Sequence, residues 1–97
     1  MYTKEQILSI LRREKNDLQK AYSLSELGLF GSYATGKNTA ESDIDILVDF
    51  SKRIDGFNFI RIAHHFEDLF KMKVDLVSRK GVKSTYLPFV EKNLINV

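Results

Sequence analysis

The chain has 97 residues, of which 43% are hydrophobic and 11% aromatic, so its composition is that of a globular domain rather than a disordered or fibrous chain. Fifteen Lys and Arg residues against thirteen Asp and Glu residues give a net charge of +2, which is too small to indicate a dedicated nucleic-acid binder. The absence of cysteine excludes disulfides, thiolate catalysis and cysteine-ligated zinc. We therefore expect one cytoplasmic domain over residues 1–97, with no signal peptide or membrane span.

The chain is expected to begin with a helix and a buried strand. Thr3 and Gln6 have the spacing of a capping box, and apolar residues then recur at helical spacing, which predicts a helix over residues 4–22. The short apolar run at residues 27–30 predicts a buried strand, and Gly31 indicates that the chain leaves this strand through a tight turn.

A short helix and a second strand are expected next. Ser32 is expected to cap a short helix that runs toward Gly36, and the polar residues 37–42 indicate a loop. Residues 43–48 have the sequence Asp-Ile-Asp-Ile-Leu-Val, which predicts a strand because β-branched side chains dominate. Carboxylates are unusual in such a strand.

The second half of the chain predicts a long helix, a third strand and a final short helix. Apolar side chains from residue 59 onward fall on one helical stripe, so a helix is expected to about residue 71. Residues 74–77 predict a strand, and Pro88 is expected just before a short helix over residues 89–94. This order predicts an α+β fold in which a small mixed sheet is flanked by helices.

Three carboxylates are expected to converge on one side of this sheet. Because side chains alternate along a strand, Asp43 and Asp45 project from one face while their isoleucine neighbours project from the other. Asp75 lies between two apolar residues of the next strand, which places it on the same side. Such crowded charges require a compensating cation, and hard oxygen ligands favour Mg²⁺ or Mn²⁺. Asp43, Asp45 and Asp75 are therefore the predicted metal ligands.

A second candidate feature is the turn at Gly31 and Ser32. A strand-to-helix turn leaves backbone N–H groups unpaired, and glycine allows the backbone to approach a phosphate closely. The Ser32 hydroxyl adds another donor. A phosphate-binding turn beside a carboxylate metal site is what an enzyme that processes nucleoside triphosphates requires.

These motifs resemble a known superfamily. Gly31-Ser32 followed after ten residues by Asp43-Ile44-Asp45 is similar to the signature of the DNA polymerase β-like nucleotidyltransferases, and Asp75 matches their third carboxylate. The fuller pattern over residues 31–36 and 42–48 resembles the minimal nucleotidyltransferase branch, which implies a polymerase β palm-like fold.

The resemblance also implies site roles and a reaction. The resemblance implies that two Mg²⁺ ions assist the transfer of a nucleotidyl group from ATP or a related triphosphate, and that this group is AMP. Asp43 and Asp45 would bind both metals, Asp75 would complete the metal site nearest the acceptor, and Gly31 and Ser32 would hold the outer phosphates. This sequence has Thr35 where the family often has arginine, which puts full activity in doubt.

The resemblance further implies a protein partner. Many minimal nucleotidyltransferases are antitoxins of HEPN-domain toxins, so AMP transfer to a tyrosine of such a partner is expected, with no direct binding of nucleic acid. A protein that neutralises its partner by binding alone is the alternative. A small-molecule antibiotic nucleotidyltransferase is disfavoured because we expect no second domain. The basic stretch over residues 71–83 indicates either a solvated face or the surface where the partner docks.

Two other metal-dependent classes and a histidine mechanism are disfavoured. Sugar-nucleotide glycosyltransferases also use Asp-x-Asp, but their domains are far longer. A calcium-binding EF-hand loop would need oxygen ligands where residues 46–48 are apolar. His64 and His65 lie beside the apolar stripe of the long helix, so we expect them to be structural or solvated.

Overall fold

The computed structural model describes residues 2–97 and contains a four-stranded sheet with strand order β3-β2-β1-β4. Strand β1 runs antiparallel to both β2 and β4, whereas β2 and β3 are parallel, so the sheet is mixed as predicted. The strands are β1 (Leu24–Phe30), β2 (Ile44–Phe50), β3 (Val74–Ser78) and β4 (Ile95–Asn96).

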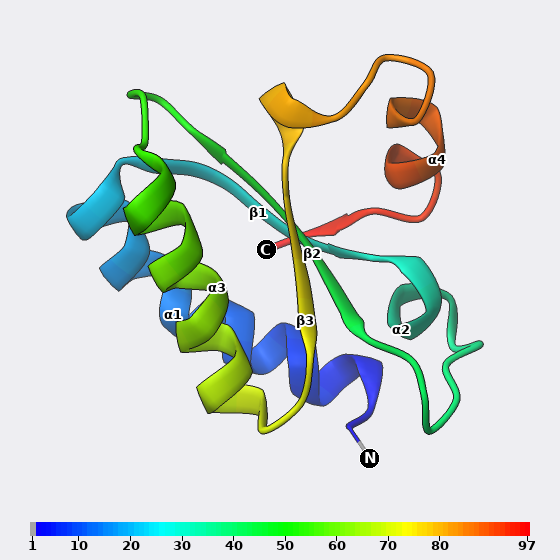
Figure 1. The fold of residues 1–97 in the computed structure, drawn as a ribbon. Helices are drawn as coiled ribbons and strands as arrows, with labels where there is room; N and C mark the ends of the chain where they lie inside the picture. Colours follow the sequence, from blue (N-terminus) through cyan, green and yellow to red (C-terminus); the bar gives the residue numbers. More distant parts are fainter. Residues whose placement is uncertain (1) are drawn as a thin grey trace.

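Helices accompany the sheet in two groups. The two long helices, α1 and α3, lie side by side, while the short helices α2 and α4 lie on the other side of the crossing strands (Figure 1). A single 3₁₀ turn, η1, follows β3. The helices are α1 (Lys4–Tyr22), α2 (Gly31–Thr35), α3 (Gly56–Phe70), α4 (Leu87–Glu91) and η1 (Arg79–Gly81).

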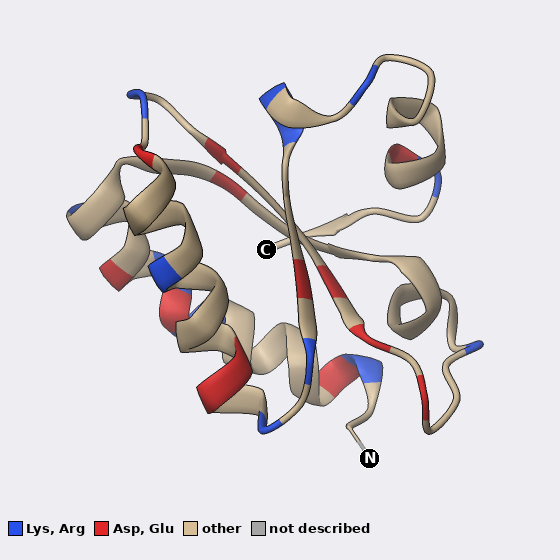
Figure 2. Cartoon of the chain, in the orientation of Figure 1, with Lys and Arg blue, Asp and Glu red and all other residues tan. Residues whose placement is uncertain are grey.

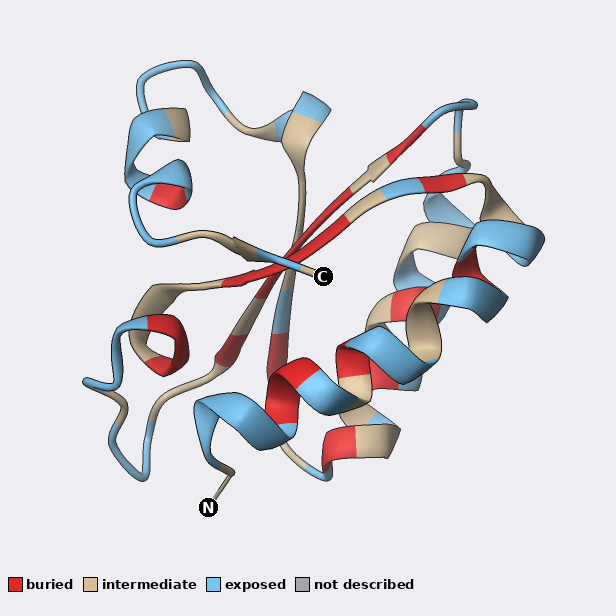
Figure 3. Ribbon diagram, turned by 180° about the vertical axis from the view of Figure 1, so that it is seen from behind, coloured by how far each residue is buried: buried red, intermediate tan, exposed pale blue. Residues whose placement is uncertain are grey.

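Both long helices begin at a side-chain cap and bury one stripe against the sheet. The predicted capping box is present at α1, where the Thr3 side chain accepts from the Gln6 N–H and the Gln6 side chain accepts from the Thr3 N–H. At α3 the Asp55 side chain accepts a hydrogen bond from the Asn58 N–H, without a reciprocal bond to the Asp55 backbone. The buried stripes of both helices face the strands (Figure 3), and residues such as Phe66 are wholly buried there.

The two faces of the sheet differ in chemistry. Ile44, Ile46 and Val48 point into the core with α1 and α3, as their alternation predicted. Leu47 is also fully buried, but it lies on the opposite face because successive strand residues alternate. Asp45 and Asp49 flank Leu47 on that opposite face, which we call the polar face. The candidate site residues lie on the polar face.

Two elements, α2 and β2, begin differently from the prediction. The short helix α2 begins at Gly31 with Phe30 as its N-cap, and no side-chain cap is present, so the predicted capping role of Ser32 was wrong. Strand β2 begins at Ile44, whose N–H donates to the carbonyl of Lys73 at 3.1 Å, and Asp43 therefore lies just ahead of the strand.

The end of the chain also differs from prediction. Helix α4 begins at Leu87 rather than Phe89, with Pro88 in its first turn, where a missing N–H costs no helical hydrogen bond. Strand β4 was not predicted. No helix formed by residues 2–97 has the length and apolarity that a membrane span needs.

Candidate active site

Strand register brings two of the predicted carboxylates together. In the parallel pairing of β2 with β3, Asp45 lies opposite Asp75. Paired residues share one face of a sheet, so both side chains belong to the polar face. The acidic segments of the two strands run next to each other (Figure 2). Asp43 immediately precedes the first residue of β2.

The Asp45 carboxyl group titrates abnormally. Burial, together with the negative charges of Asp75 and Asp43, raises the pKa of Asp45 to about 6. No cation or hydrogen-bond donor among residues 2–97 opposes this effect at the Asp45 side chain. Asp43 has Lys73 at 4.0 Å, but that lysine side chain is 76% exposed, so solvent screens the attraction.

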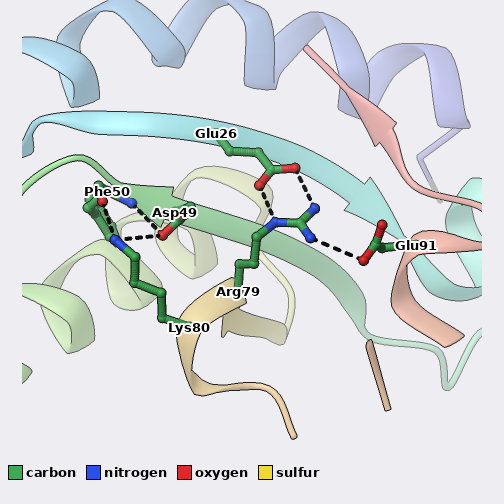
Figure 4. Close-up of polar contacts among 6 residues, drawn as sticks. All are labelled: Glu26, Asp49, Phe50, Arg79, Lys80 and Glu91. Carbon is green, nitrogen blue, oxygen red and sulfur yellow. Dashed lines mark hydrogen bonds and ion pairs between the residues drawn. The ribbon is translucent and has the colours of Figure 1, made fainter. Parts of the chain in front are cut away.

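A second carboxylate pair on the polar face is neutralised by the protein itself. Glu26 lies opposite Asp49 in the pairing of β1 with β2. Arg79 donates two hydrogen bonds to Glu26, at 2.6 and 2.8 Å, and Lys80 lies 3.5 Å from Asp49 (Figure 4). The hydrogen bonds from Arg79 lower the pKa of Glu26. On this face Glu26 therefore has a two-point arginine partner, Asp43 and Asp49 each lie near an exposed lysine, and Asp45 and Asp75 have no cationic partner among residues 2–97.

Gly31 packs directly against Asp45. Its φ of +73° lies in the left-handed region, and a Cβ at this position would overlap the Oδ2 atom of Asp45. The Asp45 carboxylate therefore occupies the space that a side chain at position 31 would need, which explains the glycine. The hydroxyl of neighbouring Ser32 has no hydrogen-bond partner among residues 2–97, which leaves it available to a ligand.

Thr35, the residue that departs from the family pattern, forms a hydrogen bond within its own helix, α2. The Thr35 hydroxyl donates to the carbonyl of Ser32 at 3.2 Å, and Thr35 itself is exposed. The Lys37 backbone N–H donates to the same carbonyl at 3.0 Å, and its side chain is exposed. Thr35 thus supplies no positive charge at the turn, and Lys37 is the nearest basic residue in sequence.

The carboxylates can supply some, but not all, of the ligands that a Mg²⁺ ion needs. Within the described part of the chain, no group of three or more His, Asp or Glu side chains forms a ready metal cage. Mg²⁺ in phosphate-processing sites is typically held by one or two carboxylates together with substrate phosphates and water. Asp45 and Asp75, with Asp43 beside them, meet that requirement.

The two histidines and the basic stretch have other contacts than the candidate site. His65 contacts Glu14 at 2.6 Å, which links α3 to α1, and His64 is exposed, so the prediction that both are structural or solvated is confirmed. Within the basic stretch over residues 71–83, Arg79 contacts Glu26 and Lys80 lies near Asp49, while the docking of a partner on this stretch stays a prediction. Sequence analysis did not foresee the pairing of Arg79 with Glu26.

Comparison with known proteins identifies the family. The family model described as nucleotidyltransferase domain matches residues 8–96. The protein adenylyltransferase MntA of Thermococcus cleftensis is 37% identical over 97 residues, which cover 100% of this chain and 98% of the relative.

Solved structures agree on the fold. A putative minimal nucleotidyltransferase superposes with a TM-score of 0.80 at 26% identity, covering 99% of this chain and 97% of the other. A chain from the complex of tri-AMPylated Shewanella oneidensis HEPN toxin with MNT antitoxin gives a TM-score of 0.65 at 22% identity over 96% of this chain and 66% of the other, a likeness of fold. The chain therefore belongs to the nucleotidyltransferase domain family, among its small MntA-like members.

Proposed function

We propose that this protein is a Mg²⁺-dependent protein adenylyltransferase that moves AMP from ATP to a tyrosine hydroxyl of a HEPN-domain toxin and thereby acts as its antitoxin. The observation that carries the proposal is the contrast on the polar face. Arg79 holds Glu26 with two hydrogen bonds, whereas Asp45 and Asp75 lie side by side with no cation beside them among residues 2–97, against the Gly31 turn.

Each residue has a distinct role in this proposal. Gly31 and Ser32 contact the outer phosphates, through the close backbone approach that glycine permits and the free serine hydroxyl. Asp43, Asp45 and Asp75 would bind Mg²⁺, or Mn²⁺ in its place, and Asp75, on the edge strand β3, would complete the metal site that serves the acceptor hydroxyl. When bound, the ions activate the acceptor oxygen and stabilise charge on the α-phosphate as pyrophosphate leaves.

Relatives support a protein acceptor. The MntA relative is named a protein adenylyltransferase, and the MNT antitoxin described above is bound to a HEPN toxin that carries AMP groups. Asp75 is exposed, so a hydroxyl on another macromolecule can reach the unpaired carboxylates.

Mass spectrometry tests the proposal. The candidate HEPN partner is mixed with ATP, Mg²⁺ and either the wild-type chain or the double variant Asp43→Asn with Asp45→Asn. We expect an added AMP mass on a partner tyrosine with the wild type only. Asp49→Asn is the matched control, because it removes an acid from the same strand and face near Lys80, and it should retain transfer.

The substitution of arginine by Thr35 favours one alternative, a binding protein without turnover. If the wild type and the double variant suppress the partner equally and neither adds AMP, the enzymatic proposal is wrong and neutralisation occurs by complex formation.

A further inference from the structure

Strand β3, which carries Asp75, forms one outer edge of the sheet. No strand among residues 2–97 pairs on its far side. The opposite edge of the sheet is β4, which has only two residues, whereas β3 has five. A very short edge strand resists pairing with another chain, but an unpaired strand of ordinary length is a template for it. The edge of β3 is therefore where this sheet can accept another strand.

Backbone hydrogen bonds show which groups of β3 face outward. The Ile44 N–H donates to the Lys73 carbonyl at 3.1 Å. This bond sets the phase of the parallel ladder, so the backbone groups of Asp75 and Val77 also face β2. Successive residues of a strand direct their backbone groups to opposite edges, and the residues between these therefore direct theirs away from β2.

Two contacts agree with the outward direction of these alternate residues. The Val74 N–H donates to the Glu67 side chain of α3 at 3.4 Å, and the Ser78 carbonyl accepts from the Val82 N–H at 3.1 Å. Leu76 lies between them, and no group among residues 2–97 bonds to its outward N–H or carbonyl. The carbonyls of residues 74 and 76 and the N–H groups of residues 76 and 78 therefore remain open to an added strand.

An added strand would place a side chain directly beside Asp75. Neighbouring strands lie about 4.8 Å apart, and paired residues share one face of a sheet. The residue paired with Asp75 therefore projects from the polar face, next to the carboxylates that would hold the metal. Its two neighbours project toward the other face, where Leu76 packs against the core and is only partly buried. A hydroxyl residue between two apolar residues fits this edge.

We propose that the acceptor protein presents its tyrosine in an extended segment that pairs with β3, with an apolar residue on either side of that tyrosine. The inference rests on the proposed function, since it specifies how the acceptor reaches that site. A second copy of this chain is a poorer occupant. Pairing of β3 with itself would bring two Asp75 carboxylates to neighbouring cross-strand positions, where like charges repel.

Leu76→Pro tests the pairing on the side of this chain. Proline removes the N–H that faces away from β2, and edge strands tolerate proline for that reason. Leu76→Ala is the matched control, because it also removes the leucine side chain but keeps the N–H. With the candidate HEPN partner, ATP and Mg²⁺, Leu76→Pro should transfer AMP about 2- to 10-fold more slowly than Leu76→Ala, the factor for one lost hydrogen bond. Both variants should bind Mg²⁺-ATP equally well.

Amide exchange of the wild-type chain, measured by NMR, gives the second readout. In the free chain, the N–H groups of Leu76 and Ser78 should exchange faster than those of Asp75 and Val77, which bond to β2. The partner, added with Mg²⁺ and a non-hydrolysable ATP analogue, should slow exchange at residues 76 and 78 and leave residues 75 and 77 little changed. A contact made by side chains alone would not single out alternate residues.

Two outcomes would overturn the inference and leave the proposed function intact. One is equal transfer to the partner by Leu76→Pro and Leu76→Ala, and the other is unchanged exchange of the Leu76 N–H in the complex. The exchange measurement needs no variant, so it decides the question even where Leu76→Pro does not fold. If the wild-type chain adds no AMP to the partner, the proposed function fails and this inference fails with it.

Discussion

The Asp45 carboxyl group makes the folded protein less stable when it ionises. Its pKa is raised from 3.8 to about 6 in the fold, so between these values the folded state binds more protons than the unfolded state. Stability contributed by protonated Asp45 is therefore fully present below pH 3.8 and is lost as pH rises through about 6. A site that costs stability without a ligand is typical of function rather than of packing.

Asp45→Asn should reveal this cost. In the absence of metal, the variant should exceed the wild type in stability by on the order of 1 kcal/mol at pH 8, because solvent screening reduces the full linkage value, and the gain should vanish near pH 4. Urea denaturation at both pH values measures the difference. Asp49→Asn should lack this pH-dependent gain, since Lys80 lies 3.5 Å from Asp49. A variant that is strongly destabilised at both pH values would make Asp45 a structural residue.

Gly31 and Gly36 have nearly the same backbone conformation, so Gly36 serves as a control for substitutions of Gly31. The φ angles of Gly31 and Gly36 are +73° and +77°, so alanine at either position is strained by the backbone alone, by about 1 kcal/mol or more. A Cβ at Gly36 meets nothing within 4 Å, whereas one at Gly31 overlaps the Asp45 carboxylate. The difference between the two variants isolates that overlap.

We expect Gly31→Ala to lower stability further than Gly36→Ala and to weaken ATP binding, with Asp45→Ala restoring part of the stability. Chemical denaturation of the single and double variants gives the coupling energy between the two positions. Equal destabilisation by the two glycine substitutions, with no coupling to Asp45, would show that the contact does not determine the choice of glycine.

At the scale of elements, Arg79 joins three parts of the fold. It lies in η1, forms a two-point contact with Glu26 of β1 and reaches Glu91 of α4. A planar guanidinium can make the two parallel hydrogen bonds to Glu26, whereas a lysine ammonium cannot reproduce them.

Arg79→Lys should therefore cost about 1–2 kcal/mol of stability, because Glu26 loses its two-point contact and α4 loses its attachment to the sheet. Chemical denaturation measures the loss. Arg13→Lys is the control, since Arg13 is 67% exposed and lies as far as 4.0 Å from its partner, so it should leave stability unchanged. Equal stability of the two variants would show that the two-point contact contributes nothing to the fold.

Local sequence determined the long elements well. Helix α1 was predicted over the residues it occupies because a capping box and an apolar stripe act within a few residues of each other. Strand β4 could not be predicted, since Ile95 and Asn96 form a strand only by pairing with Gly28 and Leu29 far away in the chain. Tertiary pairing creates that element, and no local periodicity marks it.

The candidate site was predictable in part for the same reason. Alternation along β2 and the apolar neighbours of Asp75 placed Asp45 and Asp75 on one face, and the strand register agrees. The contact of Arg79 with Glu26 joins residues 53 positions apart, so composition showed only a basic stretch. Sequence analysis also missed Tyr86 and Phe89, which line a pocket with Gly31 and Thr35, because they follow no apolar stripe and remain exposed.

At the scale of the whole molecule, the sheet separates stability from function. Helices α1 and α3 cover the apolar face and enclose the core, while the carboxylates lie on the polar face (Figures 1 and 2). Substitutions on the polar face can therefore alter ligand binding with little loss of the core. This separation allows the metal and the phosphates to be tested individually.

The last prediction concerns how these ligands combine. Because the described side chains form no three-residue metal cage, Mg²⁺ alone should bind weakly, and phosphate oxygens should complete its coordination. Mg²⁺ with ATP at about 100 times its Kd should stabilise the protein by roughly 2.7 kcal/mol, which corresponds to a rise in Tm of roughly 10–20 °C for a domain of this size. ATP with EDTA, or Mg²⁺ by itself, should give a small fraction of that shift. The combined effect should also grow as pH rises through about 6, since Asp45 must lose its proton to bind the ion. A full shift from Mg²⁺ alone would mean that the carboxylates form a complete cage, and that the phosphates play no part in holding the metal.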